Sequence, residues 1–453
     1  DPAGGTYEMI PKVFLLPAAD GIWIVGGTLQ AKWSADTQIL EEARLDNCSR
    51  VVEAVVTANG PATLCAQKAE GGPSSPFSIN APEGITTPET GNVGVPYNLR
   101  VGPDGQLALD FADEPEEFAS MLYFDLGRLS NGWMEFGIEN TEGRVPWSQL
   151  YYLNGFLDFL YQSERAPEEW AEFQPILSDI RHRLTMETQL LDDVWSGGLY
   201  KTRAFSVDRS PQLFAVQTAR LLLFLDRYED EVADVDIASI EDLRAAVGEL
   251  RDHIENKTAG GQSPGWIPAN ATYLRWPKGS AFYFDGLNVP YNHQNEWAYG
   301  LTRTGIGEPA EADDILRHFL RRVAPDGYLP ATGSWDYWWG KALDGWAVDE
   351  RVSENTPEYA GDRSEAWISF RSIDAMSALA MAGRLPPRVA RALLDSAGYL
   401  VSAGKLYPFV SYELRRAGVL PDIPDDVARR YIRISSPWEI QSAAWAYGAM
   451  LAP

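Results

Sequence analysis

Two stretches of the chain, Pro290–Gly300 (PYNHQNEWAYG) and Pro437–Gly448 (PWEIQSAAWAYG), begin with Pro and end with the same four residues, Trp-Ala-Tyr-Gly. An EAW motif at 365–367 lies midway between them, and Pro146–Gln149 (PWSQ) begins a similar stretch earlier in the chain. A helical pattern that recurs along a sequence is typical of architectures built from repeated helical pairs. The repeat therefore predicts several similar helices arranged in a ring or an array.

The predicted helical segments are of two kinds. Five are apolar on all sides and poor in charge: Pro146–Tyr161, Pro211–Leu225, Pro290–Thr302, Ser364–Ala382 and Pro437–Leu451. Four are amphipathic, with charges between apolar positions: Pro167–Leu191, Ser239–Ile254, Pro309–Val323 and Pro387–Leu400. Apolar inner helices covered by charged outer helices are expected in two concentric rings. We therefore expect a mainly α fold, an (α/α) barrel or toroid of five to six helical hairpins. An open solenoid has the same local pattern, but the long aromatic connections favour the toroid.

The first 112 residues show strand signals instead. Short β-branched or aromatic runs such as Val51–Val56 alternate with turn residues, and Ala58–Pro61 (ANGP) predicts a hairpin turn. Cys48 and Cys65 flank this hairpin, and the sequence alone allows either a disulfide or two buried thiols. We expect two domains: a β-rich N-terminal region over 1–112 and a toroidal catalytic domain over 113–453.

The composition restricts the partners of the chain. A net charge of −26 argues against nucleic acid and anionic membranes, which are bound by dense Lys and Arg surfaces. No uninterrupted apolar run approaches the roughly 18 residues of a membrane span. Neither the two cysteines nor any motif indicates a metal or cofactor site, so none is expected. The first residue is Asp1, as in a processed secreted or periplasmic protein or a trimmed chain. The oligomeric state stays open.

Aromatic residues make up 12% of the chain, including 16 Trp and 20 Tyr. Their flat apolar faces and polar edges suit a groove that stacks on sugar rings, although a large core also collects Trp. We therefore expect a poly- or oligosaccharide as the partner. Long aromatic segments at 265–285 and 325–366 are expected to line the mouth of the toroid. The Trp residues expected to bind substrate there are Trp335, Trp338, Trp147 and Trp438.

The stretch Tyr291–Trp297 (YNHQNEW) is the densest polar and aromatic cluster at the start of an inner segment. His293 is a candidate base and Glu296 a candidate acid or base, because both side chains can exchange a proton with a substrate. The candidates for substrate binding are Tyr291, Asn292, Asn295 and Trp297. The alternative is a hydrogen-bonded network that caps the helix and tethers the loop.

A second cluster is acidic and lies in the segment 353–366. Glycoside hydrolysis uses two carboxyl groups across the scissile bond, one of them protonated. The catalytic candidates are Glu358, Asp362 and Glu365, with Asp285, Asp336 and Asp344 as secondary candidates. Arg363 is a candidate for binding the carboxylate of a uronic acid. The alternative is a solvated acidic loop, which a chain with 64 Asp and Glu is expected to contain by chance.

Two short stretches resemble known families. The stretch Asn292–Trp297 (NHQNEW) is similar to the Asn-His-aromatic stretch of toroidal alginate-type polysaccharide lyases, in which Asn and His neutralise the uronate carboxylate and a Tyr/His pair moves the proton. The stretch Asp362–Trp367 (DRSEAW) is similar to the Arg-Gly-Gln-Ala-Trp stretch of unsaturated-glucuronyl hydrolases, except that Ser364 and Glu365 replace Gly and Gln. Each similarity covers six residues or fewer. Together they imply an (α/α)-toroid carbohydrate-active enzyme.

Three functions are consistent with these features. The scarcity of Lys and Arg in the mouth segments favours a neutral glycan and a glycoside hydrolase with paired carboxylates such as Glu296 and Glu365. The first alternative is a lyase or uronate epimerase that acts through His293 with Tyr and Asn, and the second is a non-catalytic glycan-binding protein. Adjacent inner helices of a toroid would share one rim. We therefore expect five side chains to converge in a single mouth: Tyr291, His293, Glu296, Arg363 and Glu365.

Overall fold

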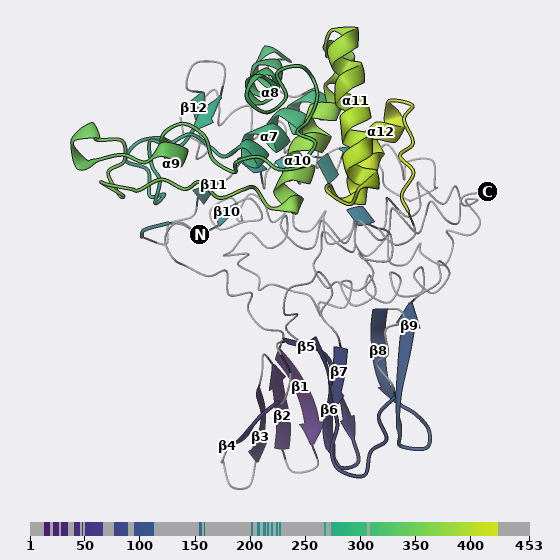
Figure 1. Ribbon diagram of the computed structural model, residues 1–453. Helices are drawn as coiled ribbons and strands as arrows, with labels where there is room; N and C mark the ends of the chain where they lie inside the picture. Colours follow the sequence, from purple (N-terminus) through teal and green to yellow (C-terminus); the bar gives the residue numbers. More distant parts are fainter. Residues whose placement is uncertain are drawn as a thin grey trace. The chain divides into compact units, whose positions relative to one another are not determined.

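The computed structural model describes residues 13–112 with gaps at 19–20, 27–28, 35–39, 46–47, 49, 67–76 and 89–94, scattered positions between 154 and 227, and the ranges 267–268, 273–305 and 309–424. The chain divides into two compact units. The first contains strands β1–β9, and the second contains the remaining described strands and all the described helices (Figure 1).

The first unit is built from three antiparallel sheets. One is a four-stranded meander with the strand order β1 (Val13–Ala18), β2 (Gly21–Gly26), β3 (Leu29–Ser34) and β4 (Leu40–Arg44). The second contains β5 (Arg50–Thr57), β6 (Gly60–Ala66) and β7 (Phe77–Asn80), and the third pairs β8 (Val95–Val101) with β9 (Leu107–Ala112). The side chains of Ala62, Leu64, Leu99 and Leu107 form a buried core between β6 and the β8–β9 pair.

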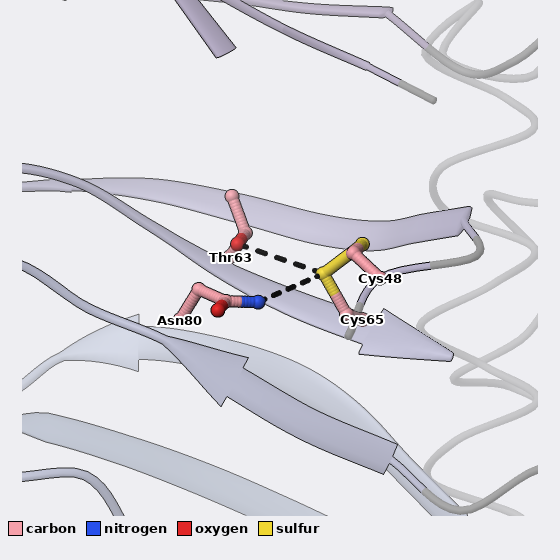
Figure 2. The surroundings of a disulfide bond; sticks show 4 residues. All are labelled: Cys48, Thr63, Cys65 and Asn80. Atoms are coloured by element: carbon pink, nitrogen blue, oxygen red, sulfur yellow. Dashed lines mark hydrogen bonds between the residues drawn. A yellow bond between two sulfur atoms is a disulfide. The ribbon is translucent and has the colours of Figure 1, made fainter. Parts of the chain in front are cut away.

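The predicted hairpin at 58–61 is confirmed, because β5 and β6 pair directly and Thr57 lies opposite Gly60. Gly60 has a φ of 133°, a backbone conformation that favours glycine. Cys48 and Cys65 are joined by a disulfide, which answers the question that the sequence left open. Figure 2 shows the side chains of Thr63 and Asn80 pointing toward the Cys65 sulfur, and the Asn80 amide nitrogen lies 3.3 Å from it.

The second unit contains six described helices, of which four are longer than ten residues. The long helices are α7 (Tyr291–Thr304), α8 (Pro309–Val323), α10 (Ile368–Ala380) and α11 (Pro387–Ser402). The short ones are α9 (Lys341–Asp344), α12 (Ser411–Arg416) and the 3-10 turns η3 (Val348–Glu350), η4 (Ala382–Arg384) and η5 (Pro408–Val410). Two-residue strands form two small ladders: β10 (Lys201–Thr202) with β11 (Gln212–Leu213), and β12 (Ile267–Pro268) with β13 (Leu274–Arg275).

The central helices α7 and α10 pack against each other, and α7 also packs against α8 (Figure 1). Helix α8 buries a single stripe, Ala312, Ile315, Leu316, Phe319 and Leu320, at the spacing expected of an amphipathic helix. Helix α7 is buried at eleven of its fourteen residues. The predicted burial of Ala298 and Ala375 is confirmed, since both are 0% exposed, whereas Leu222 and Ala444 lie outside the side chains that the structure describes.

The glycine of the WAYG motif on α7 has a packing role. A Cβ atom at Gly300 would lie 3.4 Å from the Cβ of Ala219, which belongs to a second helical segment. Glycine at this position lets the two backbones approach closely.

The prediction of a mainly α toroid of five to six hairpins is wrong. The described part of the chain has six helices and no closed ring, and strands dominate its first hundred residues. Alternation of charged and apolar helices is required wherever helices pack in layers, so it does not determine whether the layers close. The predicted segments at 167–191, 239–254 and 437–451 lie outside the described residues.

Two long segments beside the helices are joined by hydrogen bonds to one buried acid. Asp285 is 0% exposed, and its carboxylate accepts the backbone N–H of Gly279 at 2.6 Å, those of Glu354 and Asn355 at 3.0 Å, and the Ser353 hydroxyl. Burial opposes ionisation, but these donors prevail and lower the pKa of Asp285. This carboxylate therefore joins the segment before α7 to the segment before α10. None of the helices in the described ranges has the length and apolar character of a membrane span.

Candidate functional site

The polar residues at the start of α7 lie inside the second unit. Asn292 and Asn295 are 0% exposed and Glu296 is 2% exposed. They are buried because α7 is covered by neighbouring segments on nearly every side. Neither polar atom of the Asn292 amide has a hydrogen-bond partner in the described part of the chain. These residues form the interior of a helix interface and do not project into an open groove.

Glu296 forms a buried ion pair. Its Oε2 atom lies 2.8 Å from a guanidinium nitrogen of Arg220, and both side chains are less than a tenth exposed. Burial raises the pKa of Glu296 to about 7, and the charge of Arg220 opposes part of this rise. Together with Leu223, Met376 and other residues, Glu296 lines a small pocket.

Asp374 on α10 is a second buried acid, and the sequence analysis missed it. Its Oδ1 accepts a hydrogen bond from the Asn295 amide at 2.7 Å, and its Oδ2 accepts one from the Trp335 indole at 2.9 Å. Burial raises its pKa to about 8, these two donors oppose the rise, and the nearby charge of Glu296 adds to it. One signal could have identified Asp374: it is the one acidic residue of the helix ISFRSIDAMSALA.

The remaining aromatic candidates of this cluster also belong to the core. His293 packs edge-on against Trp276, with ring centroids 6.4 Å apart, and burial lowers its pKa to about 3, so it is neutral near pH 7. Tyr291 is 4% exposed and stacks on Trp339, and burial raises its pKa. Trp297 is 4% exposed and donates its indole N–H to Glu311 at 3.3 Å.

Two of the tryptophans predicted to bind substrate are buried as well. Trp335 is 7% exposed and Trp338 is 5% exposed. Trp338 packs edge-on against Trp276 and Tyr337, with ring centroids 6.4 and 5.0 Å apart. Trp147 and Trp438 lie outside the described residues.

The acidic cluster contains an exposed site that the sequence did not resolve. The segments around Trp335 and Glu365 run antiparallel: Ala366 N–H donates to the Trp335 carbonyl at 2.9 Å, and Asp336 bridges to Glu365. Residues directly opposite each other in such a pair have Cβ atoms about 4.5–5.5 Å apart on one face. The exposed carboxylates of Asp336 and Glu365 are therefore neighbours although 28 residues separate them in the sequence.

An exposed aromatic platform adjoins this pair. Trp367 is 65% exposed and stacks on Phe370 with the rings 3° from parallel and their centroids 5.6 Å apart. Phe370 in turn packs on Tyr337, with centroids 5.1 Å apart. Trp367 follows Glu365 by two residues, and its own backbone is extended, with a ψ of 157°.

One cation lies within the same group of residues. The backbone N–H of Arg371 donates to the Trp367 carbonyl, and the charge of Glu365 acts on the Arg371 guanidinium. Burial lowers its pKa and Glu365 opposes this, while its Nε atom has no hydrogen-bond partner in the described ranges. We name the Trp367 surface by its members: Asp336, Tyr337, Glu365, Trp367, Phe370 and Arg371.

The other residues predicted from the acidic loop lie beside this surface or away from it. Asp362 is partly buried and accepts the Ser364 N–H at 2.8 Å. Arg363 is exposed and pairs with Asp344 at 3.5 Å, and Glu358 is exposed. Of the residues predicted to share one mouth, Arg363 and Glu365 are exposed, whereas Tyr291 and Glu296 are buried.

No family model matches the chain, no curated protein matches it, and no solved structure matches it. The similarities of the NHQNEW and DRSEAW stretches to toroidal enzymes thus remain predictions. Within the described ranges, no group of three or more His, Cys, Asp or Glu is arranged to hold a metal ion.

Proposed function

We propose that this protein binds a carbohydrate at the Trp367 surface. The observation that carries the proposal is the exposed indole of Trp367, held flat by its stack on Phe370. A rigid aromatic face suits the apolar C–H face of a sugar ring, and it loses little conformational freedom on binding because it is already packed on one side. The carboxylates of Asp336 and Glu365 and the guanidinium of Arg371 supply hydrogen-bond partners for hydroxyl groups around the ring.

The charge of the surface supports a glycan without carboxylates. It carries two acids and one Arg, within a chain of net charge −26, so a polyuronate would approach against repulsion. The Cys48–Cys65 disulfide supports a secreted or periplasmic location, where such bonds persist and extracellular glycans are met.

Binding is tested with Trp367→Ala and a panel of neutral, amino and uronate oligosaccharides, by calorimetry or fluorescence. Loss of a central aromatic contact typically weakens binding by about tenfold or more. Tyr399→Ala is the matched control, because Tyr399 is 59% exposed on α11 and does not belong to the surface. Equal affinities of Trp367→Ala and the wild type for every ligand would contradict the proposal.

The paired carboxylates favour a second function, hydrolysis of a glycosidic bond. Glycoside hydrolases place two carboxyl groups roughly 5–10 Å apart, and the cross-strand position of Asp336 and Glu365 is compatible with that separation. Asp336 thereby replaces Glu296 as the proposed partner of Glu365. The lyase alternative loses support from the burial of Tyr291 and from the lowered pKa of His293, which makes His293 a weak base.

Hydrolysis is tested with Glu365→Gln, which keeps the shape of the side chain but removes its titrating proton. Turnover is expected to fall on the order of 10²–10⁴-fold while saccharide binding persists. The assay follows new reducing ends from the oligosaccharide panel. Wild-type protein that binds a glycan but releases no reducing ends would leave binding as the function and reject hydrolysis. New ultraviolet absorbance of the products would indicate elimination instead.

A further inference from the structure

A single buried carboxylate connects the two halves of the Trp367 surface. Asp374 is 1% exposed and accepts hydrogen bonds from two different elements, Asn295 of α7 and Trp335 of the segment before α9. Trp335 directly precedes Asp336, and its carbonyl accepts the Ala366 N–H next to Glu365. The position of the Trp335 indole therefore fixes the strand that carries one carboxylate and, through the bridge, the other.

The same carboxylate lies on the helix that carries the aromatic half of the surface. Phe370 and Arg371 precede Asp374 by four and three residues on α10, so the three side chains lie close together on neighbouring turns. Trp367 immediately precedes this helix. A displacement of Asp374 would thus move Asp336 and Glu365 through Trp335. It would also move the stacked rings of Trp367 and Phe370 through α10.

The environment of Asp374 accommodates both of its protonation states. An ionised carboxylate accepts the two N–H groups that it now receives. In the protonated state its O–H needs an acceptor, and Asn295 Oδ1 is a buried acceptor without a hydrogen-bond partner in the described ranges. The Asn295 amide presents either its N–H₂ or its oxygen to Asp374 when it rotates by half a turn. The Trp335 N–H remains a donor in both states, but its bond is stronger to the charged form.

We propose that Asp374 is a positioning residue that regulates the Trp367 surface: its ionisation tightens the hold on Trp335 and raises the affinity of the surface for saccharide. This inference rests on the proposed function for its saccharide ligand. The coupling between Asp374 and the Trp367 surface, however, can be measured without a ligand. Because burial raises the pKa of Asp374 to about 8, the change falls between about pH 6 and pH 9.

Other ionisable groups lie near Asp374, and their titration has to be distinguished from that of Asp374. The elements packed against α10 carry these titratable or charged groups: Tyr291, His293, Glu296, Tyr299 and Arg303 on α7; Glu311, Asp313, Asp314, Arg317, His318, Arg321 and Arg322 on α8; Arg384 on η4; Arg388, Arg391, Asp395 and Tyr399 on α11; and Tyr412, Glu413, Arg415 and Arg416 on α12. Outside these elements, Arg220 pairs with Glu296, and Asp336 follows Trp335 in the sequence. Among these groups, Glu296 has a pKa of about 7, and its charge raises the pKa of Asp374. The variant Glu296→Gln removes its titration, so any change that persists in that variant belongs to another group.

The experiment follows the indole N–H resonances of Trp335 and Trp367 from pH 5 to pH 9.5 in full-length protein labelled at tryptophan nitrogen. In the wild type and in Glu296→Gln, both resonances are expected to shift with one common midpoint. In Asp374→Asn neither shifts. If Trp335 titrates and Trp367 does not, Asp374 is merely structural and the proposal is overturned. The wild-type titration decides this even if Asp374→Asn does not fold.

Saccharide affinity is then measured across the same pH range. We expect a rise on the order of three- to tenfold from pH 6 to pH 9 in the wild type, as for a neutral hydrogen bond replaced by a charged one. Asp395→Asn, an exposed acid on α11, is the matched control and retains the rise, whereas Asp374→Asn has a flat profile. Equal profiles in all three proteins would overturn the regulation. Absence of any saccharide binding would reject the proposed function, and the two resonances would still decide the coupling.

Discussion

The interior of the α7–α10 interface and the Trp367 surface contain the same kinds of residue in opposite environments. In the interior, Glu296 and Asp374 are 2% and 1% exposed and are bound by Arg220, Asn295 and Trp335. At the surface, carboxylates and aromatic rings of similar composition face solvent, and Trp367 is 65% exposed. The difference shows that acid and aromatic residues near a helix start indicate an important cluster without indicating whether a ligand can reach it.

Removal of a carboxylate should separate the two regions most clearly. Glu296→Ala withdraws the buried partner of Arg220, and loss of one member of a buried ion pair costs roughly 3–5 kcal/mol of unfolding free energy. Glu365→Ala removes an exposed acid and should change stability by less than about 0.5 kcal/mol. Urea unfolding at pH 8, where Glu296 is ionised, measures both. Similar losses in the two variants would mean that the two environments are not different.

The pH dependence of stability sharpens the same contrast. The pKa of Glu296 is raised from its ordinary 4.5 to about 7 in the folded state, so the folded protein binds more protons than the unfolded chain between these values. The contribution of Glu296 to stability is thus complete below about pH 4.5 and is lost as the pH rises to about 7, by at most about 1.4 kcal/mol per pH unit.

Glu296→Gln is the matched comparison for this effect, because it retains shape but does not titrate. The wild type should lose stability relative to this variant between pH 5 and pH 7, as measured by urea unfolding at each pH. His293 acts in the opposite sense, since its lowered pKa removes stability as the pH falls below about 6.5, but it is present in both proteins and cancels. A constant difference between the two proteins would contradict a raised pKa.

The sequence predicted the local elements better than their assembly. The strands near 13–26 and 51–66 and the helices at 291–304, 309–323 and 387–402 follow from alternation, turn residues and helical spacing, all of which are local properties. The toroid did not follow, because ring closure depends on packing angles between helices that periodicity does not encode. The N-terminal sheets were anticipated as a region but not as three separate sheets.

The candidate site shows the same limit at the level of single residues. Glu365 and Asp362 were found from their density in one segment, and Glu296 from its place in the YNHQNEW stretch. The pairing of Asp336 with Glu365 depends on a bridge between distant segments, and the burial of Trp335 and Trp338 depends on which face of their segment packs inward. Trp367 belonged to the DRSEAW stretch, but only the structure shows that its side chain is 65% exposed.

The smallest expected effect is a gain in stability, opposite in sign to the loss expected for Glu296→Ala. Asp336 and Glu365 are like charges directly opposite each other across an antiparallel bridge, an arrangement that is destabilising. Asp336→Asn should therefore raise the melting temperature slightly while it weakens saccharide binding or turnover, as expected where a site sacrifices stability for function. The gain should shrink in high salt, because salt screens exposed charges. Asp326→Asn, an exposed acid before the segment, is the control and should show no gain. A loss of stability in Asp336→Asn, or a gain that salt leaves unchanged, would show that the two carboxylates do not repel each other, and the proposed catalytic pair would then lack its basis.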